Sequence, residues 1–153
     1  MKIWQKNIDV DAFVEAFTVG NDRAMDLHLA SADVLGSLAH TQMLHHIGLL
    51  SQQDLAQVQQ ALKDIYKEID AGDFTIDAVV EDVHSQIEML LTNRIGEAGK
   101  KIHSGRSRND QVLVDLKLYF RSEIQQLVTN VEALFKQLIA LSDKHKSVLM
   151  PGY

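Results

Sequence analysis

Basic and hydroxyl side chains are concentrated in one short stretch of this sequence, residues 100–110. The stretch has four cations and no acid before its last residue, although the whole chain has a formal charge of -6. A helix is predicted to begin directly after it, and a helix N-terminus presents unpaired N–H groups and the positive end of its dipole. Arginine side chains, hydroxyls and such N–H groups together suit a carboxylate or a phosphate. The cations are Lys100, Lys101, Arg106 and Arg108.

A plainer interpretation of the same stretch is a solvated basic loop. In that case Asn109 or Asp110 only caps the helix that follows. Residue types and spacing leave both interpretations open, because a high density of donors suggests an anion site without being specific for one.

A second group of ionisable residues opens the preceding predicted helix. Glu81 and His84 are three residues apart, the spacing of helical di-iron sites. Such sites need a second pair of this kind, and no other Glu in the chain has a His three residues later. We therefore expect no metal site. The acidic residues suit the first turn of a helix, and His84 taken alone favours a structural role.

The composition of the chain and the motifs that it lacks argue against several other functions. The chain has no Cys and therefore neither disulfides nor thiolate metal sites, and it has no Gly-rich phosphate loop and no nucleophile elbow. The negative net charge argues against a nucleic-acid partner. The sequence also has no apolar run near the roughly 20 residues that a membrane span needs, and its first residues are too polar for a signal peptide. We expect a cytoplasmic protein.

The fold is predicted to be all-α, because the only proline of the chain is Pro151. Ser51 is expected to cap a helix that Gly72 ends. Apolar residues at helical spacing, with Gly96 and Gly99 ending the fourth segment, predict five helices, at about residues 9–17, 23–47, 52–71, 81–94 and 110–146.

The last predicted helix has an apolar row whose mean spacing is that of a bundle or coiled coil, about 3.5 residues. The helix would be roughly 55 Å long, whereas a compact domain of this chain length has a radius of gyration of about 15 Å. We therefore expect its packing partners in another subunit or in sequence outside this chain. The row comprises Leu113, Leu116, Phe120, Ile124, Leu127, Val131, Leu134, Leu138 and Leu141.

Four segments resemble one known family. Residues 103–112, His-Ser-Gly-Arg-Ser-Arg-Asn-Asp-Gln-Val, resemble the signature segment of the argininosuccinate lyase family. Residues 33–40 and 81–96 are similar to two earlier segments of that family, and residues 150–153, Met-Pro-Gly-Tyr, to its Pro-Gly-Tyr segment. The four segments follow the family's order, and the resemblance extends from about residue 11 to the end.

This resemblance implies the fold and activity of the fumarase/aspartase superfamily. Its members are all-helical homotetramers in which four subunits contribute long helices to a central bundle. Residues 1–109 would be the N-terminal helical lyase domain, and residues 110–153 the first long helix of an incomplete bundle domain. The implied reaction is the reversible β-elimination of argininosuccinate to arginine and fumarate in arginine biosynthesis. It uses no metal and no organic cofactor.

The resemblance also implies the roles of individual residues. Ser107, Arg108 and Asn109 are expected to bind the substrate, and Asp82 and His84 to shape the same pocket. The family's proton-transfer groups are a Thr-His pair, expected directly after Tyr153, and a serine on a distant loop. No catalytic residue is therefore assigned within this chain, which we expect to be a truncated form that is inactive alone.

The match to the family has departures. The family's early substrate-binding serine has no clear counterpart, and the candidates for its contact are Thr18, Asn21, Asp22 and Arg23. One alternative is a catalytically inactive structural or oligomerisation protein of the same fold, a use that lens crystallins resembling this family illustrate. Another alternative is a helical interaction module whose exposed apolar helix binds other helices.

Overall fold

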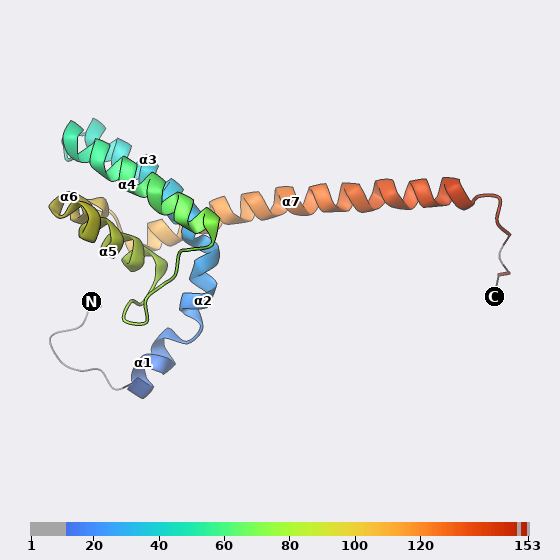
Figure 1. Ribbon diagram of the computed structural model, residues 1–153, viewed down its shortest axis with the longest axis horizontal. Helices are drawn as coiled ribbons and strands as arrows, with labels where there is room; N and C mark the ends of the chain where they lie inside the picture. The colour runs from blue at the N-terminus through green and yellow to red at the C-terminus, as the bar shows by residue number, and fades with distance from the viewer. Residues whose placement is uncertain (1–11, 150, 153) are drawn as a thin grey trace. The chain divides into compact units, whose positions relative to one another are not determined.

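The computed structural model describes residues 12–149, 151 and 152 of the chain. It divides into two compact units, residues 1–117 and residues 118–153, which are described separately. All regular secondary structure in the described residues is helical (Figure 1), so the predicted all-α fold class is confirmed.

Unit 1 contains short and long helices joined by tight connections. In chain order, the α-helices and the two 3₁₀ turns (η) are α1 (Ala12–Val19), α2 (Asp22–Asp26), η1 (Leu27–Leu29), α3 (Ala30–His46), α4 (Gln52–Ala71), α5 (Val83–Ile95), α6 (Glu97–Lys100), η2 (Lys101–His103) and the first turns of α7 (Arg108–His145). Part of the first predicted helix, residues 9–11, lies outside the described residues.

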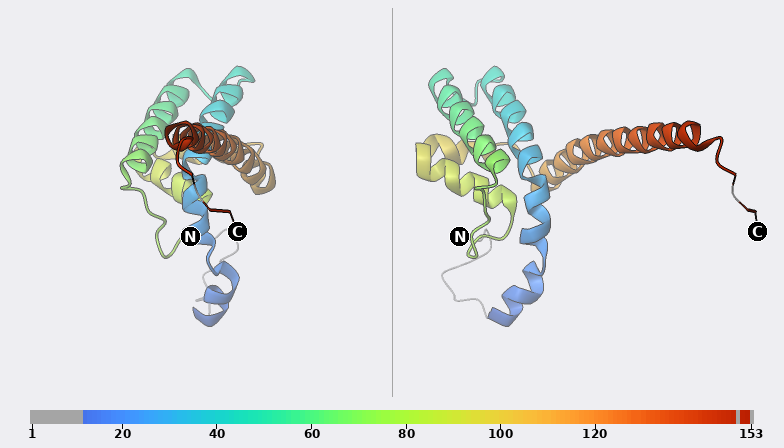
Figure 2. Two further views of the ribbon diagram at one scale, coloured as in Figure 1. Left: turned by 90° about the vertical axis from the view of Figure 1, so that its right-hand side faces the viewer. Right: turned by 45° about the vertical axis from the view of Figure 1, so that its right-hand side comes forward.

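Helices α3 and α4 form an antiparallel hairpin and lie side by side in all three views (Figures 1 and 2). The ends of α4 are those that the sequence predicts. The hydroxyl of Ser51 accepts a hydrogen bond from the Asp54 N–H at 3.1 Å, and Gly72 ends the helix in the left-handed conformation at φ 80°. Gln59 of α4 donates to the Leu38 carbonyl of α3 at 2.9 Å.

The main core of unit 1 lies between this hairpin and α5. Helix α5 contributes Val83, Ile87 and Leu91, which lie four residues apart on one face of the helix. The other buried members of the core come from α3, α4 and the segments that flank α5: Ala30, Val34, Val58, Ala61, Leu62, Ile65, Phe74, Ala98 and Ile102.

The single helix predicted over residues 23–47 is not observed. The structure divides this stretch into α2, the 3₁₀ turn η1 and α3. Tertiary hydrogen bonds hold α2 against the start of α5. The Asp26 carboxylate accepts from the Val83 N–H at 3.1 Å, and Arg23 Nε donates to the Val80 carbonyl at 2.6 Å. Both partners are 57 residues away in sequence, so local helical periodicity could not predict the break.

Helix α5 begins two residues later than predicted, and one of the two glycines expected at its end has a different role. It begins at Val83 because the Asp82 carboxylate caps it, accepting the Ser85 N–H at 2.6 Å. Gly96 ends it as predicted. Gly99 does not end the helix but lies within α6, against the backbone of α5, where an added Cβ would come within 2.6 Å of the Leu91 carbonyl carbon. Only glycine allows this close approach.

Helix α7 is continuous over 38 residues, about 57 Å of helix. In unit 2 its apolar row remains open: from Phe120 to Leu141 every Leu, Ile, Val and Phe side chain is at least 42% exposed. None of the described helices has a stretch apolar enough to span a membrane.

We predict that Gly99→Ala destabilises unit 1. The new methyl group would lie 2.6–2.8 Å from backbone atoms of Leu91 and Thr92, which cannot move aside as a flexible side chain could. Overpacking of this kind costs about 1–3 kcal/mol. Urea unfolding followed by circular dichroism measures the loss. Gly152→Ala is the matched control, because no atom lies within 4 Å of its added Cβ. Equal midpoints for the two variants would contradict this account.

We also predict that the 153-residue chain associates in solution. Water would otherwise contact an apolar row that extends over six helical turns, an unfavourable arrangement for a monomer. Light scattering after size exclusion should give a mass above the 17.2 kDa of one chain. Replacing Leu127 and Leu134 by Glu should return the mass to that of one chain. A monomeric unmodified chain would contradict the prediction.

Candidate functional site

Helix α3 anchors the loop that precedes α7. Arg106 Nη1 donates to the Ser37 hydroxyl at 3.0 Å, and the His40 ring nitrogen Nε2 lies 3.0 Å from the Ser104 carbonyl oxygen. Between these anchors Gly105 adopts φ +64°, which lets the chain turn toward α7. Ser37 and His40, one turn apart on α3, therefore hold the loop in position at the start of α7.

The side chains of Ser107 and Asp110 both accept backbone hydrogen bonds at the start of α7. The Ser107 hydroxyl accepts from the Asn109 N–H at 3.2 Å, and the Asp110 carboxylate accepts from the Ser107 N–H at 2.7 Å. The Asp110 bond is one half of a capping box, with Asp in the position of the usual Glu, whereas the Ser107 hydroxyl binds the N–H two residues later instead of three. The helix therefore starts at Arg108, two residues earlier than predicted, and Asn109 is not its cap.

The cations of residues 100–110 do not gather at one point. Lys100 pairs with Glu97, Lys101 pairs with Asp54 of α4 at 2.6 Å, and Arg106 bonds to α3. Arg108 instead faces α5. The charge that is concentrated in the sequence is thus distributed in space over several partners.

Arg108 is held by contacts to α5 and to its own helix. Its Nη1 donates to Gln111 Oε1 at 3.1 Å, and its Nη2 donates to the Ser85 hydroxyl at 3.2 Å. The same Nη2 lies 3.5 Å from a Glu88 oxygen, and Nε lies 3.9 Å from Asp82 Oδ2. The side chain as a whole remains 22% exposed, while Nε is buried without a hydrogen-bond partner, so the guanidinium is oriented by the protein and is accessible in part.

A cavity of about 330 Å³ lies beside this guanidinium, with Arg108, Lys100, Ser85, Glu88 and Asn93 among its lining residues. Ser107 and Asn109 are exposed and do not line it. Of the residues expected to bind substrate, the structure therefore brings Arg108 and Asp82 together. Ser107, directly before α7, and Asn109, in its first turn, are sequence neighbours of Arg108 but face solvent.

His84 lies in a buried group that joins three helices. Its Nδ1 is 3.0 Å from Asp33 Oδ1 on α3 and 3.6 Å from Asp115 Oδ2 on α7. Gln111 Nε2 donates to the same Asp33 oxygen at 2.6 Å. Asp33 and Asp115 are fully buried, and His84 is 4% exposed. His84 is therefore buried and does not line the cavity beside Arg108.

The three ionisable groups have perturbed pKa values. Burial acts to raise the pKa of Asp33, but hydrogen bonds from His84 and Gln111 and the charge of Arg106 lower it overall. Burial and the neighbouring Asp33 charge raise the pKa of Asp115 to about 7. Burial acts to lower the pKa of His84, but the hydrogen bond and charge of Asp33 raise it. Asp33 therefore holds the negative charge, while Asp115 carries a proton in mildly acidic solution.

No role is predicted from the sequence for Asp33 or Asp115, although Asp33 opens residues 33–40, one of the segments that resemble the family, and the sequence contains a further signal for this buried group. Asp33, Ser37 and Thr41 follow at intervals of four along α3, and all three are completely buried. A polar stripe on the inner face of a helix requires partners inside the protein. Asp115, four residues after Gln111, continues the polar face of α7 toward it.

Asp33, His84 and Asp115 are also the one group in the described part of the chain whose ligand atoms could hold a metal ion, within 4.8 Å of one another. The Asp33 oxygen nearest to His84 already accepts two hydrogen bonds. The other Asp33 oxygen and both Asp115 oxygens are buried and have no hydrogen-bond partner, so one proton shared between the two carboxyl groups would fit there without displacing either donor.

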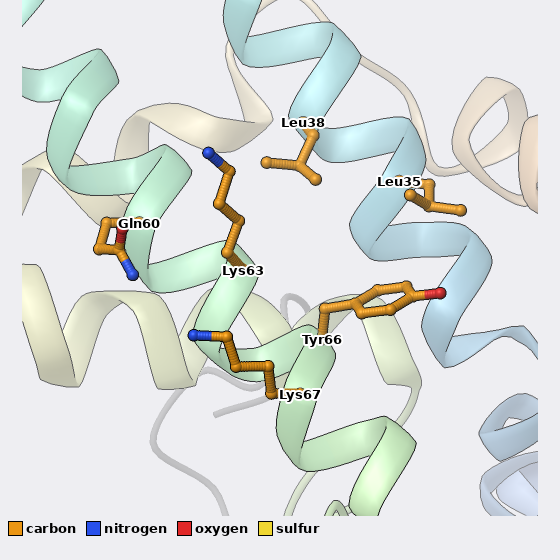
Figure 3. Close-up of a pocket in the computed structure, with 6 residues that line it drawn as sticks. All are labelled: Leu35, Leu38, Gln60, Lys63, Tyr66 and Lys67. Atoms are coloured by element: carbon orange, nitrogen blue, oxygen red, sulfur yellow. The ribbon is translucent and has the colours of Figure 1, made fainter.

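A groove of about 350 Å³ between α3 and α4 is a second candidate (Figure 3). Leu35 and Leu38 of α3 face Lys63 and Tyr66 of α4 across it. Lys67, at its edge, pairs with Asp64 at 2.8 Å. The groove contains no carboxylate or histidine among its lining residues and none of the residues expected to bind substrate.

We predict that Asp115→Asn flattens the pH dependence of unfolding. The folded Asp115 keeps its proton to about pH 7, whereas the unfolded side chain loses it near 3.8. The folded state thus binds more protons in this interval, and stability falls as pH rises from 4 to 7. The raised pKa of His84 acts in the same direction above its ordinary value of 6.5. Asparagine cannot lose the proton and removes the Asp115 contribution.

Urea midpoints at pH 5, 6, 7 and 8 test this prediction. Asp73→Asn is the control, because this carboxylate is exposed and its loss should leave the slope unchanged. Parallel curves for the unmodified chain and Asp115→Asn would show that the buried carboxyl titrates outside this range.

Comparison with known proteins identifies a family for this chain. The chain is 57% identical to argininosuccinate lyase of Bacteroides fragilis and 56% identical to that of Bacteroides thetaiotaomicron, each over 152 residues. It is 46% identical over 154 residues to argininosuccinate lyase of Methylococcus capsulatus. These matches cover 99% of this chain but 34%, 34% and 33% of the relatives, so the chain spans about a third of their length. The family described as lyase matches residues 5–153, and the chain belongs to this lyase family.

Proposed function

We propose that this chain is part of an argininosuccinate lyase, which reversibly cleaves argininosuccinate to arginine and fumarate in arginine biosynthesis without a cofactor. One observation carries the proposal: the partly accessible, oriented guanidinium of Arg108 beside a cavity, within a segment that resembles the family signature. The identity of 57% to an argininosuccinate lyase supports the choice of substrate.

The chemistry of a β-elimination suits these residues. Removal of a proton next to a carboxylate places negative charge on that carboxylate in a carbanion-like state. Oriented cations and N–H donors stabilise such charge best where water is excluded. We propose that Arg108 binds a substrate carboxylate, and that Ser107 and Asn109 contribute donors at the positive end of the α7 dipole. Both are exposed and available for a contact that neighbouring subunits complete.

Asp82 and His84 have supporting roles in this proposal. Asp82 caps α5 and lies near Arg108, so it helps to hold the guanidinium. His84 is buried, which favours shaping the pocket from beneath over direct contact with substrate. The proton-transfer groups of the reaction are proposed to lie outside this chain, which would then be inactive alone.

The assembly is proposed to be a homotetramer with a shared bundle of long helices. In this proposal residues 1–109 are the N-terminal lyase domain, and residues 110–153 are the first bundle helix. The open apolar row between Phe120 and Leu141 supports it, because three neighbouring helices would cover such a row.

We predict that Arg108→Ala slows the full-length enzyme strongly. Loss of one charge-assisted donor to the developing charge costs about 2–4 kcal/mol, or about 10²–10³-fold in turnover. Fumarate formation, followed by its ultraviolet absorbance, measures the effect. Ser122→Ala, an exposed position on α7, should be nearly neutral. A loss below tenfold would mean that Arg108 is structural, and a folded full-length protein without activity on argininosuccinate would refute the proposed function.

The same open apolar row favours one alternative, a catalytically inactive structural or oligomerisation protein of this fold. That alternative requires assembly without turnover. A tetramer that forms no fumarate would support it, whereas turnover by the tetramer would refute it.

A further inference from the structure

Gln111 connects the buried ionisable group to Arg108. It lies in the first turn of α7 and is 5% exposed. The two ends of its side-chain amide make different contacts: Nε2 donates to Asp33 Oδ1 at 2.6 Å, and Oε1 accepts from Arg108 Nη1 at 3.1 Å. One buried amide therefore joins a carboxylate on one side to a guanidinium on the other.

The chemistry of these neighbours permits only one orientation of the amide. A carboxylate without a proton can only accept hydrogen bonds, and a guanidinium can only donate them. The NH₂ end of Gln111 must therefore face Asp33, and its carbonyl oxygen must face Arg108. A flipped amide would oppose two donors at Arg108 and two acceptors at Asp33.

This orientation depends on Asp33 remaining negatively charged. His84 and Gln111 both direct hydrogen-bond donors at one oxygen of Asp33, and the Arg106 side chain adds a positive charge nearby. Asp115, which lies beside the same carboxylate, takes up the proton instead. Asp33 can thus fix the Gln111 amide while buried.

Of the contacts that hold Arg108, the hydrogen bond to Gln111 is the shortest and has the most buried partner. The half-buried Ser85 hydroxyl follows at 3.2 Å. Glu88 and Asp82 lie at 3.5 and 3.9 Å, and their side chains are 35% and 27% exposed. Solvent therefore competes for both. Gln111 makes a 3.1 Å hydrogen bond from a buried position on the same helix.

We propose that Gln111 is a positioning residue: its amide, oriented by Asp33, holds the Arg108 guanidinium in the direction from which it meets a substrate carboxylate. The positioning is a property of this chain alone, whereas its effect on turnover rests on the proposed function. The two parts are therefore tested separately.

The first experiment uses the 153-residue chain labelled with ¹⁵N-arginine. The Nε–H signal that is present in the unmodified chain and absent in Arg108→Lys is assigned to Arg108. We expect this signal to be rigid on the nanosecond scale in the unmodified chain and mobile in Gln111→Met, which keeps the side-chain length but removes both hydrogen bonds. Gln111→Asn is a second variant, one methylene too short to reach both partners, if the first does not fold. An Arg108 signal equally rigid in a folded variant overturns the proposal.

The second experiment is a double-mutant cycle in the full-length enzyme. Gln111→Met should lower kcat/KM at least about tenfold, because misplacement of a binding group by about 1 Å has effects of this size or larger. In the Arg108→Ala background the same change should cost less than twofold, since Gln111 then has nothing to position. Equal losses in both backgrounds overturn the proposal, because a general structural defect would act without Arg108.

Gln126→Met is the matched control for both experiments. It makes the same substitution on the same helix at an exposed position, and should change neither the Arg108 signal nor kcat/KM. Failure of the proposed function is distinguishable from failure of the positioning. An unmodified enzyme without turnover refutes the function, while the Arg108 signal still decides the role of Gln111.

Discussion

A fully buried carboxylate, Asp33, is the constraint on which the rest of unit 1 depends. A charge removed from water requires donors and counter-charges in fixed positions, because leaving it unpaired costs several kcal/mol. Its donors come from two other helices, His84 on α5 and Gln111 on α7. The meeting of α3, α5 and the start of α7 is therefore specified by hydrogen-bond geometry as well as by apolar contact.

The candidate site follows from this arrangement. Arg106 and His40 attach the loop to α3, Ser107 caps α7, and the first turn of α7 then presents Arg108 to α5. The basic residues that are adjacent in sequence separate because each meets a different partner. Beside the cavity, which Lys100 also lines, lies one guanidinium whose direction is set by a buried amide, an arrangement well suited to a carboxylate ligand.

Unit 2 has the opposite character. Its helix contributes no buried apolar side chain between Phe120 and Leu141, so its heptad spacing has no counterpart within the described residues. A bundle of long helices would satisfy that spacing. In the proposed tetramer, helices of other subunits would bury the apolar row of unit 2, whereas unit 1 buries its apolar side chains in its own core.

Much of this molecule follows from local pattern. Helical periodicity, the Ser51 cap and the Gly72 end predict α4, and the heptad row predicts α7, because these features depend on residues three or four apart. The resemblance of four segments indicates the family for the same reason: the motif residues are close in sequence. Even the cap by Ser107 and Asp110 is a local pattern, although residue preferences alone do not distinguish Ser107 from Asn109 or Asp110 as the capping residue.

The tertiary structure alone decided the break after α2, the place of Gly99 and the direction of Arg108. A glycine is required at position 99 because the backbone of α5 comes so close to it. Asp33 accepts hydrogen bonds from His84 and Gln111, which are 51 and 78 positions away from it in the sequence. No local pattern specifies which distant donor will meet a buried acceptor. That pairing is selected when the helices pack, because only then does water leave and each buried polar atom require a partner.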